Sequence, residues 1–246
     1  MFLATIAALD FWHLDTAIAT RWAFDAAQGQ FRGHGAFWAN GLMHAGGRDL
    51  VIALALAALV CALLGRFAPR RFPSLQGHSR ALFGGFLGMG VTVALVGAFK
   101  HFSNVDCPWD LIDFGGTQPY VGLFAARPAG LPPASGCFPA AHAASAYALL
   151  AFYFAFRDTH PRLGRFLLPA ILVLGASFGF AQQSRGAHFL SHDVWSVYIA
   201  WMTGLLSQRG WIAGDRALRT IRQRSSATFM PSRDPAQVEM RSIPER

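Results

Sequence analysis

The sequence has few charged residues for its length. Of 246 residues only 14% are charged, whereas 53% are hydrophobic, and the mean hydropathy is positive. A soluble domain would carry roughly a quarter charged residues. The shortage of charge therefore argues against a soluble globular domain and indicates a chain surrounded by lipid.

Several short motifs are also missing. The sequence contains no glycine-rich phosphate loop of the Walker type, no Cys-x-x-Cys pair and no internal repeat. Residues 1–12 are apolar but lack the basic stretch and small-residue cleavage site of a signal peptide. These absences argue against a P-loop nucleotide hydrolase and a repeat protein.

The apolar residues gather in runs of near-spanning length, at residues 49–65, 81–99, 141–156, 166–181 and 193–207. A membrane helix needs about 20 apolar residues, with roughly 17 as the lower end. We therefore predict an all-α fold, a polytopic membrane helix bundle with five clear spans. Residues 1–12 are a weaker sixth candidate, too short to span unless tilted.

The net charge of +8 comes largely from arginines in the loops 66–80 and 157–165 and in the segment after residue 208. An even number of predicted helices separates these segments, so they share one side, which the positive-inside rule makes cytoplasmic. We expect the charge to contact anionic membrane lipids and no nucleic acid. The expected location is the bacterial inner membrane.

This topology divides the chain into three parts. Residues 1–48 combine the weak span with an aromatic-rich periplasmic segment, expected as one or two amphipathic helices ending at Gly46-Gly47. Residues 49–210 form the transmembrane core. Residues 211–246 form a basic cytoplasmic tail, disordered toward its end.

Ionisable residues stand at three helix mouths on the predicted periplasmic face. Lys100, the only lysine beside twenty arginines, is either a snorkelling side chain or a point charge for a phosphate. His142 follows Pro139 at the start of a helix, where the N–H groups of Ala141 and His142 can bind an anion. The alternative is a histidine that merely lies at a helix end.

The third mouth holds Arg185, His188 and His192, which share a face if the segment is helical. The His-x-x-x-His spacing also occurs in zinc sites, but no carboxylate-rich segment accompanies it, so we expect no metal and no cofactor. Interfacial histidines without a role are the other alternative. Ionisable groups at a membrane edge are costly to keep, which favours a function.

These stretches together resemble the signature motifs of the type 2 phosphatidic acid phosphatase and haloperoxidase superfamily. The usual patterns are Lys-x6-Arg-Pro, Pro-Ser-Gly-His and Ser-Arg-x5-His-x3-Asp. The corresponding stretches here are Lys100-x6-Cys107-Pro108, Pro139-Ala140-Ala141-His142 and Arg185 to Asp193. The resemblance covers about residues 95–210 and makes residues 49–210 a transmembrane phosphatase core.

The chain departs from all three patterns. Cys107 replaces the arginine of the first motif, and Ala140 and Ala141 replace the serine and glycine of the second. Gln182 stands at the usual arginine position of the third motif, with Arg185 one turn closer to His188. His192 stands at the usual aspartate position, with Asp193 one residue later. Which of these two residues orients His188 stays open.

The resemblance implies metal-free hydrolysis of a lipid phosphate or pyrophosphate at the periplasmic face. His188 would form a phosphohistidine and His142 would act as general acid and base. The implied phosphate-binding positions are Lys100, Arg185, Ala141 and Gln182. Undecaprenyl pyrophosphate, phosphatidylglycerol phosphate, phosphatidate and the lipid A 1-phosphate are all candidate substrates.

Cys107 and Cys137 both lie in the predicted periplasmic loop 100–138. In that oxidising compartment they can form a disulfide that closes a loop of about 31 residues. The alternative is a pair of unrelated buried thiols. Two other functions also remain open: a catalytically impaired protein that binds or transports a lipid phosphate, and a membrane protein with a histidine-ligated metal or haem.

Overall fold

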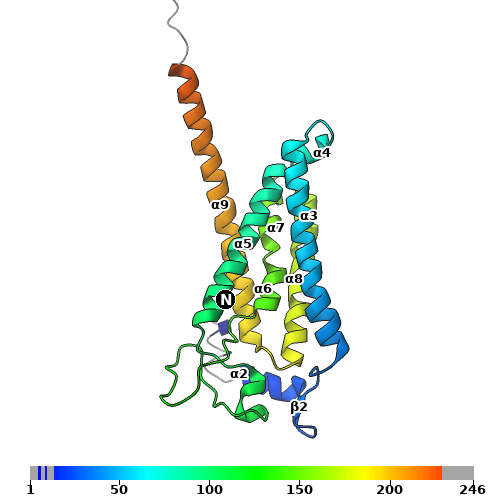
Figure 1. Cartoon of the computed structure of the whole chain (residues 1–246), viewed down its shortest axis with the longest axis vertical. Coiled ribbons are helices and arrows are strands. Elements are labelled where there is room, and N and C mark those ends of the chain that lie inside the picture. The colour runs from blue at the N-terminus through cyan, green and yellow to red at the C-terminus, as the bar shows by residue number, and fades with distance from the viewer. Residues whose placement is uncertain (1–4, 7–8, 10–13, 229–246) are drawn as a thin grey trace, which may run out of the picture. The chain divides into compact units, whose positions relative to one another are not determined.

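The computed structural model describes residues 5–6, 9 and 14–228, which are mostly helical. The long helices are α3 (Gly47–Phe67), α5 (Ser79–Phe102), α8 (Pro161–Ser184) and α9 (Leu190–Thr228). Two shorter helices, α6 (Ala141–Tyr147) and α7 (Leu150–Phe156), follow one another between α5 and α8. Figure 1 shows α3, α5, α6, α7 and α8 running side by side.

Three helical stretches are long and apolar enough to cross a membrane: Trp38–Phe67, Ser79–Phe102 and Pro161–Ser184. Large apolar side chains such as Leu56, Val91 and Val173 are exposed on them, as lipid-facing positions would be. The helix Ala141–Phe156 is apolar but shorter. The mostly helical fold with three candidate membrane-spanning helices is thus confirmed, whereas the number of five spans stays a prediction.

The core of the bundle is built around α6 and α7, whose side chains from 143 to 156 are almost all buried. Glycines bring the neighbouring helices close to them. A Cβ atom at Gly85 would collide with the ring of Phe152, and one at Gly175 would collide with Tyr147. Small residues at helix contacts allow this close approach. Close packing matters in a membrane because the hydrophobic effect does not drive helices together in lipid.

The N-terminal segment lies at one end of the bundle (Figure 1). It contains α2 (Leu14–Ile18), a π-helical turn η1 (Ala19–Ala23) and a hairpin of β1 (Phe24–Asp25) and β2 (Gln30–Phe31). The π-helical segment η2 (Trp38–Gly46) then continues directly into α3. The expectation that a helix ends at Gly46-Gly47 is therefore wrong. Both glycines have right-handed helical dihedrals, whereas a terminating glycine adopts the left-handed conformation.

The loop between α5 and α6 is irregular, with two short 3-10 turns, η3 (Pro108–Asp110) and η4 (Ile112–Phe114). A disulfide joins Cys107 to Cys137, with their Cα atoms 5.1 Å apart. A buried ion pair of 2.7 Å joins Arg127 to Asp106. Phe114 packs against the N-terminal segment, so the loop and that segment form one layer at the same end of the bundle.

The compact unit ends at Gln208, and residues 209–246 form a separate unit in which α9 continues to Thr228. The predicted disordered end of the tail, residues 229–246, lies outside the described residues, as does most of the predicted weak span 1–12.

Candidate active site

The predicted site residues come from helix ends that meet at the end of the bundle carrying the N-terminal segment. Lys100 lies near the C-terminus of α5, and His142 lies in the first turn of α6. Arg185 directly follows α8, His188 lies in the link to α9, and His192 lies in the first turn of α9. The fold therefore brings all three motifs to one place.

His188 and His192 form the buried centre of the site. Their Nδ1 atoms lie 3.4 Å apart, and the backbone of Cys137 lies in hydrogen-bonding contact with both rings. Burial, followed by the charges of His192 and Lys100, holds the pKa of His188 well below its ordinary 6.5. His188 is therefore a neutral imidazole whose Nδ1 lies beside His192.

Asp193 points to a different partner. Its carboxylate accepts a hydrogen bond from the side chain of Gln183 and lies against Gly179 of α8. The other oxygen, Oδ1, is buried without a hydrogen-bond partner among the described residues. Of the two candidates that the sequence leaves open, His192 is the one that contacts His188.

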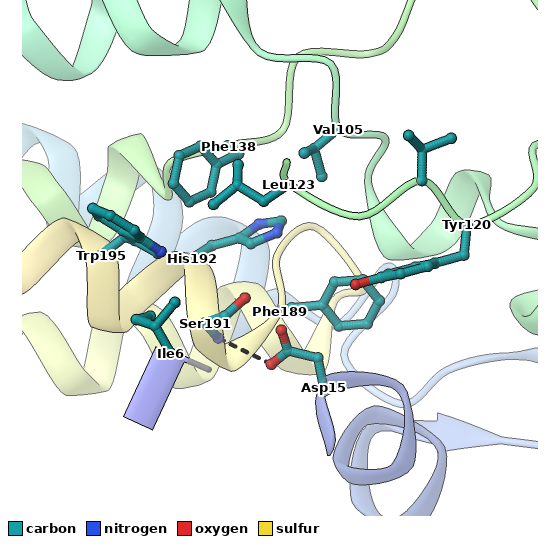
Figure 2. Close-up of a pocket in the computed structure, with 11 residues that line it drawn as sticks. Ile6, Asp15, Val105, Tyr120, Leu123, Phe138, Phe189, Ser191, His192 and Trp195 are labelled. Atoms are coloured by element: carbon teal, nitrogen blue, oxygen red, sulfur yellow. Dashed lines mark hydrogen bonds between the residues drawn. The ribbon is translucent and has the colours of Figure 1, made fainter. Parts of the chain in front are cut away.

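Asp15 fixes the start of α9. Its Oδ1 accepts a hydrogen bond of 3.0 Å from the backbone N–H of Ser191 (Figure 2). A carboxylate at this position also complements the positive end of the helix dipole. Figure 2 shows the next residue, His192, projecting into a small and mainly apolar pocket beside Phe138. The N-terminal segment thus helps to position the histidine pair.

His142 is held from two sides. Its Nε2 lies 2.9 Å from the carbonyl oxygen of Met43 in η2, and its ring stacks on Phe178 at 4.4 Å. A carbonyl oxygen only accepts hydrogen bonds, so Nε2 must carry the proton. Nδ1 is then the nitrogen of His142 that can exchange a proton with a ligand.

Gln182 connects two of the basic groups. Its Oε1 accepts a hydrogen bond of 2.9 Å from Nη1 of Arg185, and its Nε2 lies 2.9 Å from Nδ1 of His44. The ring of His44 lies 4.7 Å from that of His142. His44 belongs to none of the three motifs, although it precedes the apolar run 49–65 much as His142 and His192 stand at the start of theirs.

Cationic groups border both histidine clusters. The charge of Lys100 acts on His188 and His192, and that of Arg185 acts on His142. Within the described residues, no group of three or more His, Cys, Asp or Glu side chains could hold a metal ion. The site can therefore bind an anion and present a neutral imidazole to it.

A membrane helix bundle with a neutral buried histidine, a second histidine and two cations at one end has the groups needed to hydrolyse a phosphate ester. The chain matches the family model of the PAP2 superfamily over residues 81–212, more than half of its length. It therefore belongs to the PAP2 superfamily, whose members are phosphatases. No curated protein and no solved structure matches the chain.

Proposed function

We propose that this protein is a membrane phosphatase that removes phosphate from a lipid phosphate or pyrophosphate through a phosphohistidine on His188, without a metal ion. The observation that carries the proposal is the neutral imidazole of His188, which is held at Nδ1 beside His192 and is near the charge of Lys100. With Nδ1 beside His192, Nε2 would supply the lone pair that a nucleophile needs.

The reaction would proceed in two balanced steps. Nε2 of His188 would form a bond to phosphorus while the bond from phosphorus to the lipid oxygen breaks. His142 would enter this step as the imidazolium, with Nδ1 protonated in addition to Nε2 beside the bound phosphate, and its Nδ1 would give that oxygen the proton. A water molecule then attacks the phosphohistidine, His142 takes its proton, and inorganic phosphate leaves as the N–P bond breaks. Lys100 and Arg185 would neutralise the charge on the other phosphate oxygens.

The membrane character of the chain supports a lipid as the substrate. The site stands at one end of apolar helices such as Ser79–Phe102 and Pro161–Ser184, so a headgroup could enter it while its chains stay in the bilayer. We infer five crossings, with 141–156 and 193–207 as the two additional ones. The basic loops 66–80 and 157–165 lie at the other end, which supports a site on the periplasmic face of a bacterial inner membrane.

Phosphate release by the detergent-solubilised protein tests this function. The substrates would be phosphatidate, phosphatidylglycerol phosphate, undecaprenyl pyrophosphate and the lipid A 1-phosphate, each with and without EDTA. At least one should be hydrolysed, and EDTA should leave the rate unchanged. His188→Ala should lower the rate by about a thousandfold or more, because removal of a covalent nucleophile costs orders of magnitude.

His160→Ala is the matched control, since His160 is exposed and precedes α8 at the opposite end of that helix from Arg185. Its rate should stay within about twofold of wild type, as is usual for surface substitutions. Retention of more than about a tenth of the activity by His188→Ala would show that another group is the nucleophile. Loss of activity in EDTA would rule out the metal-free route. Lipid-phosphate binding without hydrolysis would favour the impaired binding protein.

A further inference from the structure

His44 lies inside the cluster that contains His142, Gln182 and Arg185, although it comes from η2, outside the region that matches the superfamily. Its Nδ1 contacts Gln182 and its ring lies beside that of His142. The charge of Arg185 acts on both His44 and His142. The side chain of His44 thus borders the space where the proposed phosphate would lie.

The hydrogen bonds of Gln182 determine which nitrogen of His44 carries a proton. An arginine can only donate, so the Gln182 atom that faces Nη1 of Arg185 must be the amide oxygen. The amide nitrogen then faces His44 and donates to Nδ1. Nδ1 must accept, so the proton lies on Nε2. No protein group in the described part of the chain accepts a hydrogen bond from that Nε2–H.

The other candidates for this contact are already engaged. Cys107 stands at the arginine position of the first motif but is bonded to Cys137. Arg127 pairs with Asp106 and also donates to Pro132. The charge of Arg48 also acts on His44 and His142, but its Nε donates to the carboxylate of its exposed neighbour Asp49. A phosphate in the site would lack the donors of the first-motif arginine unless another group supplies one.

We propose that His44 binds the phosphate group of the substrate through its Nε2–H and replaces one donor of the arginine that is absent at position 107. The proposal rests on the proposed function of the same site. Gln182 would act as the positioning residue, since its amide holds Nδ1 of His44 and its oxygen holds the Arg185 guanidinium. The two donors would then approach one phosphate together.

Two substitutions separate phosphate binding from a structural role. His44→Gln places an amide N–H near the position of Nε2 but removes the acceptor for Gln182. His44→Asn places an oxygen near the position of Nδ1 and keeps that acceptor, but removes the outward donor. Both variants would be purified in detergent, and thermal unfolding would verify that they fold.

The rates of hydrolysis and the inhibition constant of inorganic phosphate would be measured for wild type and both variants. A hydrogen bond to a charged group is worth about tenfold to a hundredfold. His44→Asn should therefore lose that factor in kcat/KM and bind phosphate more weakly by the same factor. His44→Gln should stay within about fivefold of wild type. It keeps a donor to the phosphate and loses only the hydrogen bond with Gln182, which joins two uncharged groups and is therefore weaker.

The reverse ranking, with His44→Asn close to wild type and His44→Gln impaired, would mean that His44 only supports Gln182 and would overturn the proposal. Equal and unchanged phosphate binding in both variants would overturn it as well. If the wild type hydrolyses nothing, phosphate binding measured by calorimetry still decides. Weaker binding in His44→Asn would then support this assignment while the proposed hydrolysis fails.

Discussion

At the residue scale, the candidate site depends on which nitrogen of each histidine carries a proton. The Met43 carbonyl places the proton of His142 on Nε2, and the amide of Gln182 places that of His44 on Nε2. In both cases a group that is not itself titratable sets the tautomer. In the proposed mechanism, proton transfer therefore belongs to His142 and phosphate binding to His44.

The buried histidine pair should make the stability of the protein depend on pH. Burial lowers the pKa of His188 well below 6.5 and that of His192 to about 3. Both rings stay neutral in the folded protein but take up protons on unfolding below pH 6.5. The contribution of this pair to the free energy of unfolding should therefore be complete above pH 6.5 and fall as the pH drops, by about 1.4 kcal/mol per pH unit for each ring.

Melting temperatures between pH 7.5 and 4.5 test this expectation, with His192→Gln as the comparison. The variant has one such ring fewer, so its melting temperature should decline less steeply in acid than that of the wild type. Because slopes are compared, a uniform loss of stability in the variant does not matter. Parallel slopes would mean that His192 is not kept neutral by the fold.

The sequence reveals the site residues that lie in short motifs and misses those whose contacts join distant parts of the chain. His142, His188 and Arg185 lie in motifs of a few residues and were found there. The bond between Asp15 and Ser191 spans 176 residues, and the contact of Met43 with His142 uses a backbone carbonyl. Neither contact leaves a pattern in the sequence. The first depends on tertiary packing, and the second uses the backbone of Met43, so any residue at that position could make it.

At the element scale, the loop between α5 and α6 is organised by its cross-links rather than by secondary structure. The disulfide joins residues on either side of the loop, 30 positions apart. Asp106 binds both Arg127 and the backbone N–H of Ser135. Cys107 lies directly before Pro108 of the first motif and Cys137 lies two residues before Pro139 of the second, so these links hold the two motifs together.

The disulfide leads to a specific expectation for thiol reactivity. Protein matured outside the cytoplasm and unfolded without reductant should show one reactive thiol, that of Cys61, and three after reduction. Cys107→Ser should lower the free energy of unfolding by about 3–4 kcal/mol, because the unfolded chain gains a free loop. The double variant with Cys137→Ser should be no less stable than either single one. Three reactive thiols without reductant would contradict the bond.

The helical elements were predicted better than the N-terminal segment. The runs 49–65, 81–99 and 166–181 correspond to α3, α5 and α8 because long apolar runs have few alternatives in a membrane. The hairpin of β1 and β2 was not predicted, since its strands have two residues each. Such short pairs are fixed by packing, here of Phe31 on Phe114, rather than by local pattern.

At the scale of the whole molecule, the compact unit has the candidate site at one end and the basic loops 66–80 and 157–165 at the other. If the basic end is cytoplasmic, exposed residues at the two ends should differ in access from outside the cell. In a Cys61→Ala background, Asp113→Cys in the loop should react with a membrane-impermeant maleimide in intact spheroplasts. Arg162→Cys, in the first turn of α8, should react only after permeabilisation. The opposite pattern would invert the proposed orientation.

The contact between η2 and His142 also bears on how this protein can be cut or recombined. The superfamily match begins at residue 81, yet the carbonyl that orients His142 belongs to Met43, and the carboxylate that caps α9 belongs to Asp15. A fragment trimmed to the matched region would retain His142 and His188 but lose the carbonyl that orients His142 and the carboxylate that caps α9. The smallest portable unit for a chimera or a fusion therefore starts upstream of α2.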